Sequence, residues 1–357
     1  MASLALDLQT LKGRRVLVIG HTGFKGSWLS YLLAQSGAKV FGIGLPAQSN
    51  PAHYELLRLA DAIDSTMCDI RNLDELSKQF RRIRPDVVFH LAAQAFVRTS
   101  YSDPYLTFST NVFGSTNILE CFRQTTSIEA LVYVTSDKCY RNKEKQQGYV
   151  ETDELGGIDP YSLSKAAAEM VYSGYVNSVL TDLPERYVAS ARAGNVIGGG
   201  DWSPNRLVPD CVRALHNSET IEIRYPGATR PWQHVLEPLS GYVRLAVGLL
   251  NREIQSGESW NFGPPEDSVN TVQEVADFIS QRWKSGTLIQ VSSPPSGMHE
   301  AGLLQLNSTK ALRDLGWRTR WDFETTLSKT TDWYRSYYNG SDARDVTSGD
   351  IRAYLSS

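Results

Sequence analysis

The chain has 357 residues, 41% of them hydrophobic, so it can bury a sizeable core in one large α/β unit or in two lobes. A formal net charge of -3 without a basic stripe argues against nucleic acid as a partner. Because no apolar run approaches roughly 20 residues and no secretory signal pattern opens the sequence, we expect a cytoplasmic protein without a membrane partner. Four widely spaced cysteines favour reduced thiols: Cys68, Cys121, Cys139 and Cys211.

Strand-like and helix-like segments alternate through the first half of the chain. Apolar runs predict strands at 14–20, 38–45, 85–93 and 129–136. Helical spacing of apolar residues predicts helices at 25–37, 72–83 and 110–124. Such alternation requires parallel pairing with right-handed crossovers, and nearly continuous apolar strands require cover on both faces. The sequence therefore predicts an α/β fold with a Rossmann-type, doubly wound parallel sheet.

The alternation weakens after about Ser190, where glycine, proline and asparagine become frequent. We expect residues 1–190 to form the dinucleotide-binding domain and residues 191–340 to form mainly a smaller C-terminal substrate lobe. One segment near 231–262 is expected to return to the sheet. The polar residues 341–357 predict a tail that is partly loose.

The motif "GHTGFKG" directly follows the first predicted strand and opens the first predicted helix. Its glycines permit a tight turn and a close backbone approach, and the N-terminus of the helix offers free N–H groups to a pyrophosphate. The sequence therefore predicts dinucleotide binding at this turn and at later strand ends. Candidate contacts are Gly20, Thr22, Gly23, Phe24, Lys25, Gly26, Asp69, Ile70, Leu91, Ala92 and Ala93.

The second predicted strand lacks the acid that usually binds the ribose of NAD. The stretch "FGIGLPAQSN" contains no Asp or Glu, and no Arg that would bind the 2′-phosphate of NADP. These residues therefore leave NAD and NADP open. Asp69 in "CDIRN" is a candidate for the adenine end, although an Asp is also common where a turn begins.

The motif "YSLSK" places Tyr161 and Lys165 four residues apart, on one face of a predicted helix that Pro160 can begin. A nearby ammonium favours the phenolate, so we expect the pKa of Tyr161 to fall. The phenol could then take a hydroxyl proton while hydride leaves the same carbon.

These motifs resemble the extended short-chain dehydrogenase/reductase family. Within it the resemblance is to the 4,6-dehydratases of nucleotide sugars, and closer to those that act on CDP-glucose. It extends from Gly20 to Trp317. The segments that carry it are "GHTGFKGSWL", "HLAAQAFVRTSYSDPYLTFSTNVFGS", "TSDKCYRNKE", "GIDPYSLSK", "ARAGNVIGGGDW", "RPWQHVLEP" and "HEAGLLQLNSTKALRDLGW".

The resemblance implies bound NAD, used without net redox change, and a 4-keto-6-deoxy sugar as product. It implies that Tyr161 takes the proton of the C4 hydroxyl, with Ser136 bonding the same oxygen, and that Lys165 holds the nicotinamide ribose. Asp137 would give a proton to the departing C6 hydroxyl. Lys138 stands where relatives have a Glu that removes the C5 proton.

The exchange of Glu for Lys138 leaves two roles open. A Lys acts as a base only when it is neutral, which burial or nearby positive charge would favour. The alternative is that Lys138 orients the cofactor or pairs with a carboxylate such as that of Glu151. A strand-end turn with two solvated charges is the purely structural reading.

Substrate contacts are expected from polar side chains in loops. Arg suits a pyrophosphate because its guanidinium is planar and forked. Candidates are Gln94, Arg192, Asn195 and Arg230, with Asn195 and Arg230 also implied by the resemblance. Relatives further imply a homodimer or homotetramer formed through helices near 109–122 and 161–176. The histidines show no metal-ligand spacing, so no metal is expected.

Two alternatives remain open. One is another enzyme of the family, either a 4-epimerase or a 4,6-dehydratase of a different nucleotide sugar. An epimerase needs no acid and base for C5 and C6, so Asp137 and Lys138 argue against that member. The other alternative is a non-enzymatic binding module that senses the cofactor, which would leave "YSLSK" unexplained.

Overall fold

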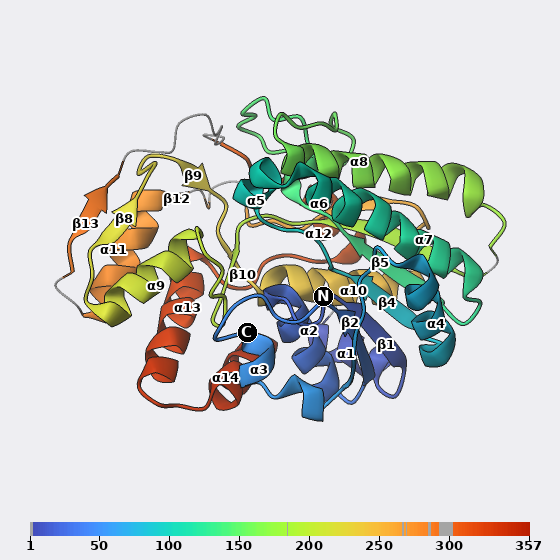
Figure 1. Ribbon diagram of the computed structural model, residues 1–357, viewed down its shortest axis with the longest axis horizontal. Coiled ribbons are helices and arrows are strands. Elements are labelled where there is room, and N and C mark those ends of the chain that lie inside the picture. Colours follow the sequence, from blue (N-terminus) through green and yellow to red (C-terminus); the bar gives the residue numbers. More distant parts are fainter. Residues whose placement is uncertain (1–2, 184, 266–267, 269, 285–286, 293–302) are drawn as a thin grey trace.

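A seven-stranded parallel sheet forms the centre of the molecule, in the order β11-β6-β5-β4-β1-β2-β3 (Figure 1). The computed structural model describes residues 3–183, 185–265, 268, 270–284, 287–292 and 303–357. The strands are β1 (Arg15–Ile19), β2 (Lys39–Gly44), β3 (Asp64–Met67), β4 (Val87–His90), β5 (Ala130–Val134), β6 (Tyr187–Arg192) and β11 (Ser259–Asn261). The predicted doubly wound sheet is confirmed.

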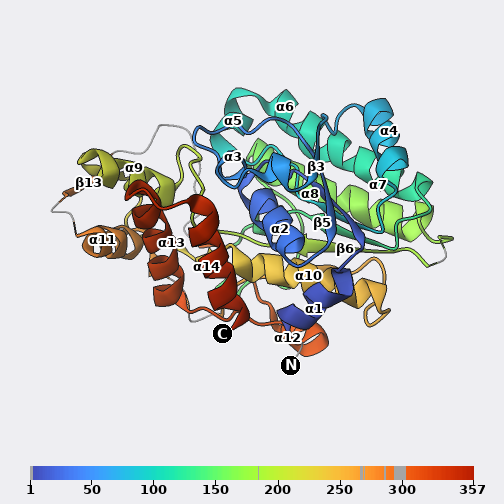
Figure 2. The same cartoon turned by 90° about the horizontal axis from the view of Figure 1, so that it is seen from below.

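Helices cover both faces of this sheet. One face carries α1 (Leu4–Leu11), α2 (Phe24–Gln35) and α10 (Leu236–Leu250), and the other carries α4 (Leu73–Ile83), α7 (Ser115–Gln124) and α8 (Pro160–Gly174) (Figure 2). Successive strand residues point to opposite faces, so Val16 and Val18 join the first core whereas Leu17 and Ile19 join the second. The continuous apolar strands of the sequence follow from this double cover.

Helix α8 begins at a well-defined point. Pro160 occupies its first turn, and the carboxylate of Asp159 accepts hydrogen bonds from the backbone N–H and the hydroxyl of Ser162. Proline suits this position because its missing N–H would have no helical partner there. Tyr161 is therefore held on the first turn of a helix that packs on the sheet.

A helical layer of short elements precedes α7. Its members are α5 (Val97–Ser102), α6 (Pro104–Phe108) and a π-helical turn (Ser109–Gly114). The buried side chain of Asn111 in this turn donates to the carbonyl of Gln94 and to the hydroxyl of Ser164. The segment after β4 is thus tied to α8.

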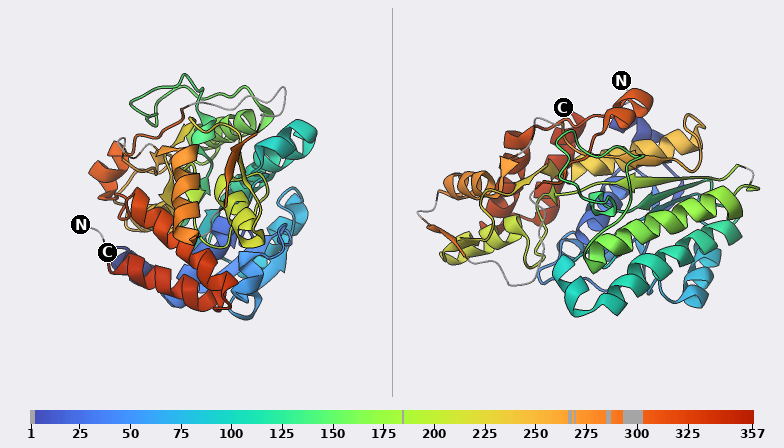
Figure 3. Two further views of the ribbon diagram at one scale, coloured as in Figure 1. Left: turned by 90° about the vertical axis from the view of Figure 1, so that its left-hand side faces the viewer. Right: turned by 90° about the horizontal axis from the view of Figure 1, so that it is seen from above.

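The second group of elements lies beyond the carboxyl edge of the sheet (Figure 3). Its helices are α9 (Leu207–Asn217), α11 (Val272–Trp283) and α13 (Phe323–Tyr338). Three two-stranded sheets accompany them: β7 (Val196–Ile197) with β10 (Gln233–His234), β9 (Thr229–Arg230) with β12 (Asn270–Thr271), and β8 (Ile221–Ile223) with β13 (Ile289–Val291). Within segment 231–262, β11 joins the large sheet beside β6, and α10 packs on a face of that sheet. The exact domain boundaries remain a prediction.

The short elements α3 (His53–Leu56) and α12 (Thr309–Leu315) complete the described helices together with α14 (Ala343–Leu355). No helix in the described part of the chain has both the length and the apolar character that a bilayer crossing demands. Residues 299–302, which begin the last segment quoted for the family resemblance, lie outside the described ranges.

The expectation of a partly loose tail is wrong, because residues 343–355 form a packed helix. The Tyr354 ring is 1% exposed, and its hydroxyl donates to Oε2 of Glu237 at 2.7 Å. Tyr31 and Ser348 share a hydrogen bond of 2.8 Å between their hydroxyls. The C-terminal helix is therefore part of the core on the α2 and α10 face.

We predict that Tyr354→Ala lowers the free energy of unfolding by about 3–5 kcal/mol, because it leaves a cavity and removes a partner of Glu237. Arg352→Ala, at an exposed position on the same helix, serves as the control and should change it little. Urea denaturation measures both. Equal midpoints for the two variants would show that the helix does not pack as described.

Candidate active site

A cavity of about 1130 Å³ lies at the carboxyl edge of the sheet, between the sheet and the second group of elements. Open α/β sheets bind ligands at this edge. Residues from the "GHTGFKG" turn, from the ends of β2, β4, β5 and β6, and from the loops before α9 line it. Among the described residues, no three His, Cys, Asp or Glu side chains come together as a metal site.

The glycine turn after β1 forms a cradle. A Cβ added at Gly20, whose φ is +92°, would lie 2.7 Å from the backbone nitrogen of Ala92. A Cβ at Gly26 would lie 2.0 Å from the carbonyl oxygen of Gly20. At Gly23, the N-cap of α2, the nearest atom would be 3.4 Å away, and no side chain caps the helix. Two glycines thus permit close packing, and the third opens the helix N-terminus to an anionic ligand.

The wall beyond β2 carries no charged side chain of its own. Residues 44–49 line the cavity, and the hydroxyl of Thr22 donates to the carbonyl of Leu45 at 2.7 Å. Asp69 lines the cavity but pairs with Arg71 at 2.6 Å, and hydrogen bonds from Arg71 lower the pKa of its carboxyl. Residues 44–49 therefore offer no carboxylate, and the Asp69 carboxylate beside them is paired with Arg71.

The triplet after β5 faces the cavity, as expected of a strand end in this sheet. Ser136, Asp137 and Lys138 all line it, and residues 137–139 form a 3₁₀ turn. The Ser136 hydroxyl donates to Oδ1 of Asp137 at 2.7 Å and accepts from the Lys138 N–H at 3.2 Å. The carboxyl of Asp137 is buried, whereas the Lys138 side chain is half-buried.

Gly194 leaves the space that the Asp137 carboxyl occupies. A Cβ at Gly194 would lie 2.0 Å from Oδ2 of Asp137, so any larger residue would have to displace the carboxyl. The sequence prediction missed this glycine. Its only local sign was its place in the glycine-rich segment "ARAGNVIGGG".

Tyr161 reaches the same end of the cavity from helix α8. Burial raises the pKa of its phenol to about 12, although a hydrogen bond with Ser136 lowers it, and the negative charge of Asp137 adds to the increase. The expected fall in pKa is therefore wrong for the protein alone. Desolvation of the phenolate outweighs the local stabilisation.

Two buried lysines stand near the cavity. Burial lowers the pKa of Lys165, one turn after Tyr161, to about 8, and the positive charge of Lys25 lowers it further. The pKa of Lys25 is also lowered to about 8, by burial and then by Arg206, while Asp137 opposes this. Lys25 lines the cavity, whereas Lys165 does not.

Arg206 is a charged residue that the sequence prediction missed. It lines the cavity, lies over the ring of Phe96 at 5.5 Å, and pairs with Asp201 at 3.5 Å. Its positive charge lowers the pKa of Tyr161 and of Lys25. The sequence signal was an Arg in the loop "SPNRLVP" just before a helix.

The structure does not bring all predicted residues together. Ile70, Leu91, Ala92, Ala93, Phe24, Asn195 and Arg230 line the cavity. Gln94 and Arg192 do not. The Gln94 amide instead donates to the carbonyl of Phe96 at 3.0 Å and to the Thr107 hydroxyl at 2.8 Å.

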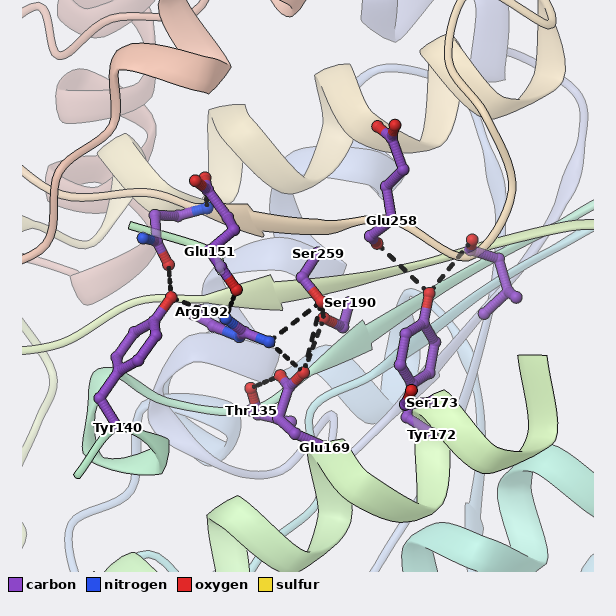
Figure 4. A network of polar contacts seen from close by, with 12 residues as sticks. Thr135, Tyr140, Glu151, Glu169, Tyr172, Ser173, Ser190, Arg192, Glu258 and Ser259 are labelled. Carbon is purple, nitrogen blue, oxygen red and sulfur yellow. Dashed lines mark hydrogen bonds and ion pairs between the residues drawn. The ribbon is translucent and has the colours of Figure 1, made fainter. Parts of the chain in front are cut away.

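The prediction that Arg192 binds substrate is corrected by its surroundings (Figure 4). It is 3% exposed and forms an ion pair of 2.7 Å with Glu169 beneath the sheet edge. An Arg whose guanidinium is committed to buried partners cannot reach a diphosphate in the cavity. Figure 4 shows it pointing towards Glu169 and Tyr140.

Residues 17–330 match the family model described as GDP-mannose 4,6 dehydratase. The chain is 43% identical to a CDP-glucose 4,6-dehydratase of Salmonella typhimurium, over 98% of this chain and 99% of that protein. It is 28% identical to a probable dTDP-glucose 4,6-dehydratase of Sinorhizobium fredii, over 90% of this chain and 92% of that protein.

Solved structures share the fold over almost the whole chain. A dTDP-glucose 4,6-dehydratase of Streptomyces venezuelae with NAD bound superposes with a TM-score of 0.76 at 22% identity, covering 91% of this chain and 98% of that one. A UDP-glucose 4-epimerase of Thermus thermophilus in complex with NAD gives 0.75 at 25% identity, covering 90% and 98%.

The coupling between the two buried lysines is testable. We predict that Lys25→Met raises the pKa of Lys165 above about 8, because a nearby positive charge disfavours the ammonium. Nuclear magnetic resonance of isotope-labelled lysine side chains, titrated with pH, measures this. Lys39→Met, at an exposed position, is the control. An unchanged Lys165 titration in Lys25→Met would mean that the two amines do not interact.

Proposed function

The chain belongs to the GDP-mannose 4,6 dehydratase family of extended short-chain dehydrogenase/reductases, and we propose that it converts CDP-glucose to CDP-4-keto-6-deoxyglucose. One observation carries the proposal: Ser136, Asp137, Lys138 and Tyr161 line one cavity, and Ser136 links Asp137 to Tyr161. A dehydratase needs proton donors and acceptors at three carbons of one hexose.

NAD is the cofactor, and the residues present fit it. The open helix N-terminus at Gly23 suits its pyrophosphate, and Gly20 permits close approach of the chain at Ala92. When bound, NAD would supply reversible hydride transfer, accepting at C4 of the glucose and donating at C6. We propose that Lys25 lies beside the diphosphate and that Lys165 supports the nicotinamide ribose, as the family resemblance implies.

Tyr161 is proposed to move the proton of the C4 hydroxyl. The phenol is poorly ionised in the protein alone, since burial raises its pKa to about 12. Positive charge beside it favours the phenolate, and Arg206 already acts in that direction. The Ser136 hydroxyl, which bonds with both Tyr161 and Asp137, is placed to bond the same substrate oxygen.

Asp137 and Lys138 are proposed to carry out the elimination. The carboxyl of Asp137 gives a proton to the C6 hydroxyl, and the neutral amine of Lys138 takes the C5 proton, so that water leaves as the C5–C6 double bond forms. The Asp137 carboxyl is buried and lines the same cavity as Tyr161. An epimerase needs neither group, and their presence in the cavity favours the dehydratase.

We propose contacts to the nucleotide sugar from the second group of elements. Asn195 and Arg230 line the cavity, and Arg206 joins them as a cation of the loop before α9. A planar guanidinium can bind a diphosphate through two parallel hydrogen bonds.

A homodimer or homotetramer formed through the helices near 109–122 and 161–176 is proposed as the assembly. The layer formed by α6, the π-helical turn and α8 exposes large apolar side chains, with Tyr105 82%, Phe113 68% and Met170 55% exposed. Apolar side chains gathered on one face of a soluble protein often mark an interface. The four free cysteines favour a reducing compartment such as the cytoplasm.

A turnover screen tests the proposed function. The purified protein is incubated with CDP-, dTDP-, GDP- and UDP-hexoses, with and without added NAD. We expect a 4-keto product, detected by its absorbance in alkali, from CDP-glucose and not from the other three. Tyr161→Phe should lower the rate by about 100-fold or more. Product from another nucleotide sugar alone, or an epimer in place of a 4-keto sugar, would contradict the proposal.

A further inference from the structure

A buried ion pair lies directly beneath the catalytic triplet. Arg192 at the end of β6 donates from Nη2 to Oε2 of Glu169 on α8 at 2.7 Å (Figure 4). Their side chains are 3% and 1% exposed. Burial raises the pKa of Glu169, but Arg192 and hydrogen bonds from Thr135 and Ser190 outweigh it, and the pKa is lowered overall. Glu169 therefore stays ionised and holds its donors firmly.

Glu169 is tied to one end of the catalytic turn. It follows Tyr161 and Lys165 at intervals of four residues, so the three share a face of α8. Its Oε1 accepts a short hydrogen bond from the hydroxyl of Thr135, the residue that precedes Ser136. The helix that carries the phenol thus holds the entry to the turn that carries the carboxyl and the amine.

Arg192 is tied to the other end of the same turn. Its Nη1 donates to the hydroxyl of Tyr140 at 2.7 Å, and Tyr140 donates in turn to Asn261 at 2.8 Å. Tyr140 directly follows the turn Asp137–Cys139 and is 1% exposed. The ion pair therefore contacts the residues that flank both sides of Ser136, Asp137 and Lys138.

We propose that Glu169 and Arg192 are positioning residues, which fix the turn of Asp137 and Lys138 relative to Tyr161 through Thr135 and Tyr140. The proposal rests on the proposed function and deepens it. It assigns a role in the elimination to a pair that touches neither substrate nor cofactor.

Stability alone does not account for this arrangement. A buried ion pair often adds little net stability over apolar residues of similar size, because both charges lose their hydration. Here each partner also contacts a residue next to the catalytic turn. Small displacements of catalytic groups cost rate steeply: a shift of about 1 Å can cost roughly 100-fold. Because Tyr161 belongs to α8 itself, loosening the turn should slow elimination more than C4 oxidation.

The test compares variants that leave both charges in place. Thr135→Val removes the bond from the turn entry to Glu169, and Tyr140→Phe removes the bond from the turn exit to Arg192. Ser259→Ala is the matched control: its hydroxyl bonds the same Arg192 at 3.0 Å, but from β11 and not from the turn. Thr135→Ser keeps the hydroxyl and should restore wild-type behaviour.

Two readouts separate positioning from a merely structural role. Amide hydrogen exchange of the cofactor-free protein should increase across residues 136–140 in Thr135→Val and Tyr140→Phe, and stay unchanged in Ser259→Ala and Thr135→Ser. In a single turnover of CDP-glucose, the first two variants should accumulate reduced nicotinamide, because elimination slows by about 10–100-fold while oxidation continues. The control should accumulate none.

Each outcome bears on one proposal. Equal exchange and equal turnover in all four variants would overturn the positioning role while leaving the dehydratase proposal intact. A uniform loss of every step, together with a lower melting temperature in Ser259→Ala as well, would also overturn it in favour of simple stabilisation. A wild-type protein that turns over no nucleotide sugar, yet shows the predicted exchange pattern, would overturn the proposed function and leave the anchoring of the turn supported.

Discussion

The end of strand β5 beneath helix α8 is the constraint on which the rest of the site depends. β5 lies inside the sheet, paired with β4 and β6, so the point where it ends cannot shift without breaking two ladders. The Ser136 hydroxyl then links Asp137 to Tyr161 across the gap to α8. A carboxyl, an amine and a phenol from two elements meet at one cavity because both elements are fixed to the same sheet.

Local patterns predicted the parts of the site that depend on local geometry. The "GHTGFKG" turn and the spacing of Tyr161 and Lys165 each lie within one turn or one helix, and the structure places both motifs on such elements. Arg192 could not be judged in this way, because its partners Glu169 and Tyr140 come from other elements. Arg206 was missed because its contact with Phe96, from another element, exists only in the folded chain. The C-terminal helix was missed because polar residues dominate its sequence, while Ile351 and Tyr354 alone supply its large buried apolar contacts.

Positive charge lies at the cavity, on Lys25 and Arg206, and close behind it, on Lys165. Lys25 and Lys165 are both buried, and desolvation lowers the pKa of each to about 8. Without a ligand, the protein therefore spends free energy to keep these two amines in their charged form. Arg206 also lines the cavity and adds a third positive charge. Diphosphate groups of a dinucleotide and a nucleotide sugar would offset this cost on binding. The positive charge of Arg206 also favours the phenolate of Tyr161.

Gly194→Ala, assayed with CDP-glucose that carries deuterium at C4, tests the central claim most directly. The wild-type protein should pass the deuterium to C6 of the product. In the variant the new methyl group must displace the Asp137 carboxyl, since the added Cβ lies 2.0 Å from Oδ2. The variant should still transfer deuterium to NAD but form product at least about 100-fold more slowly. Gly349→Ala, whose methyl group meets nothing within 4 Å, should behave as wild type. Full product formation by Gly194→Ala would contradict the account.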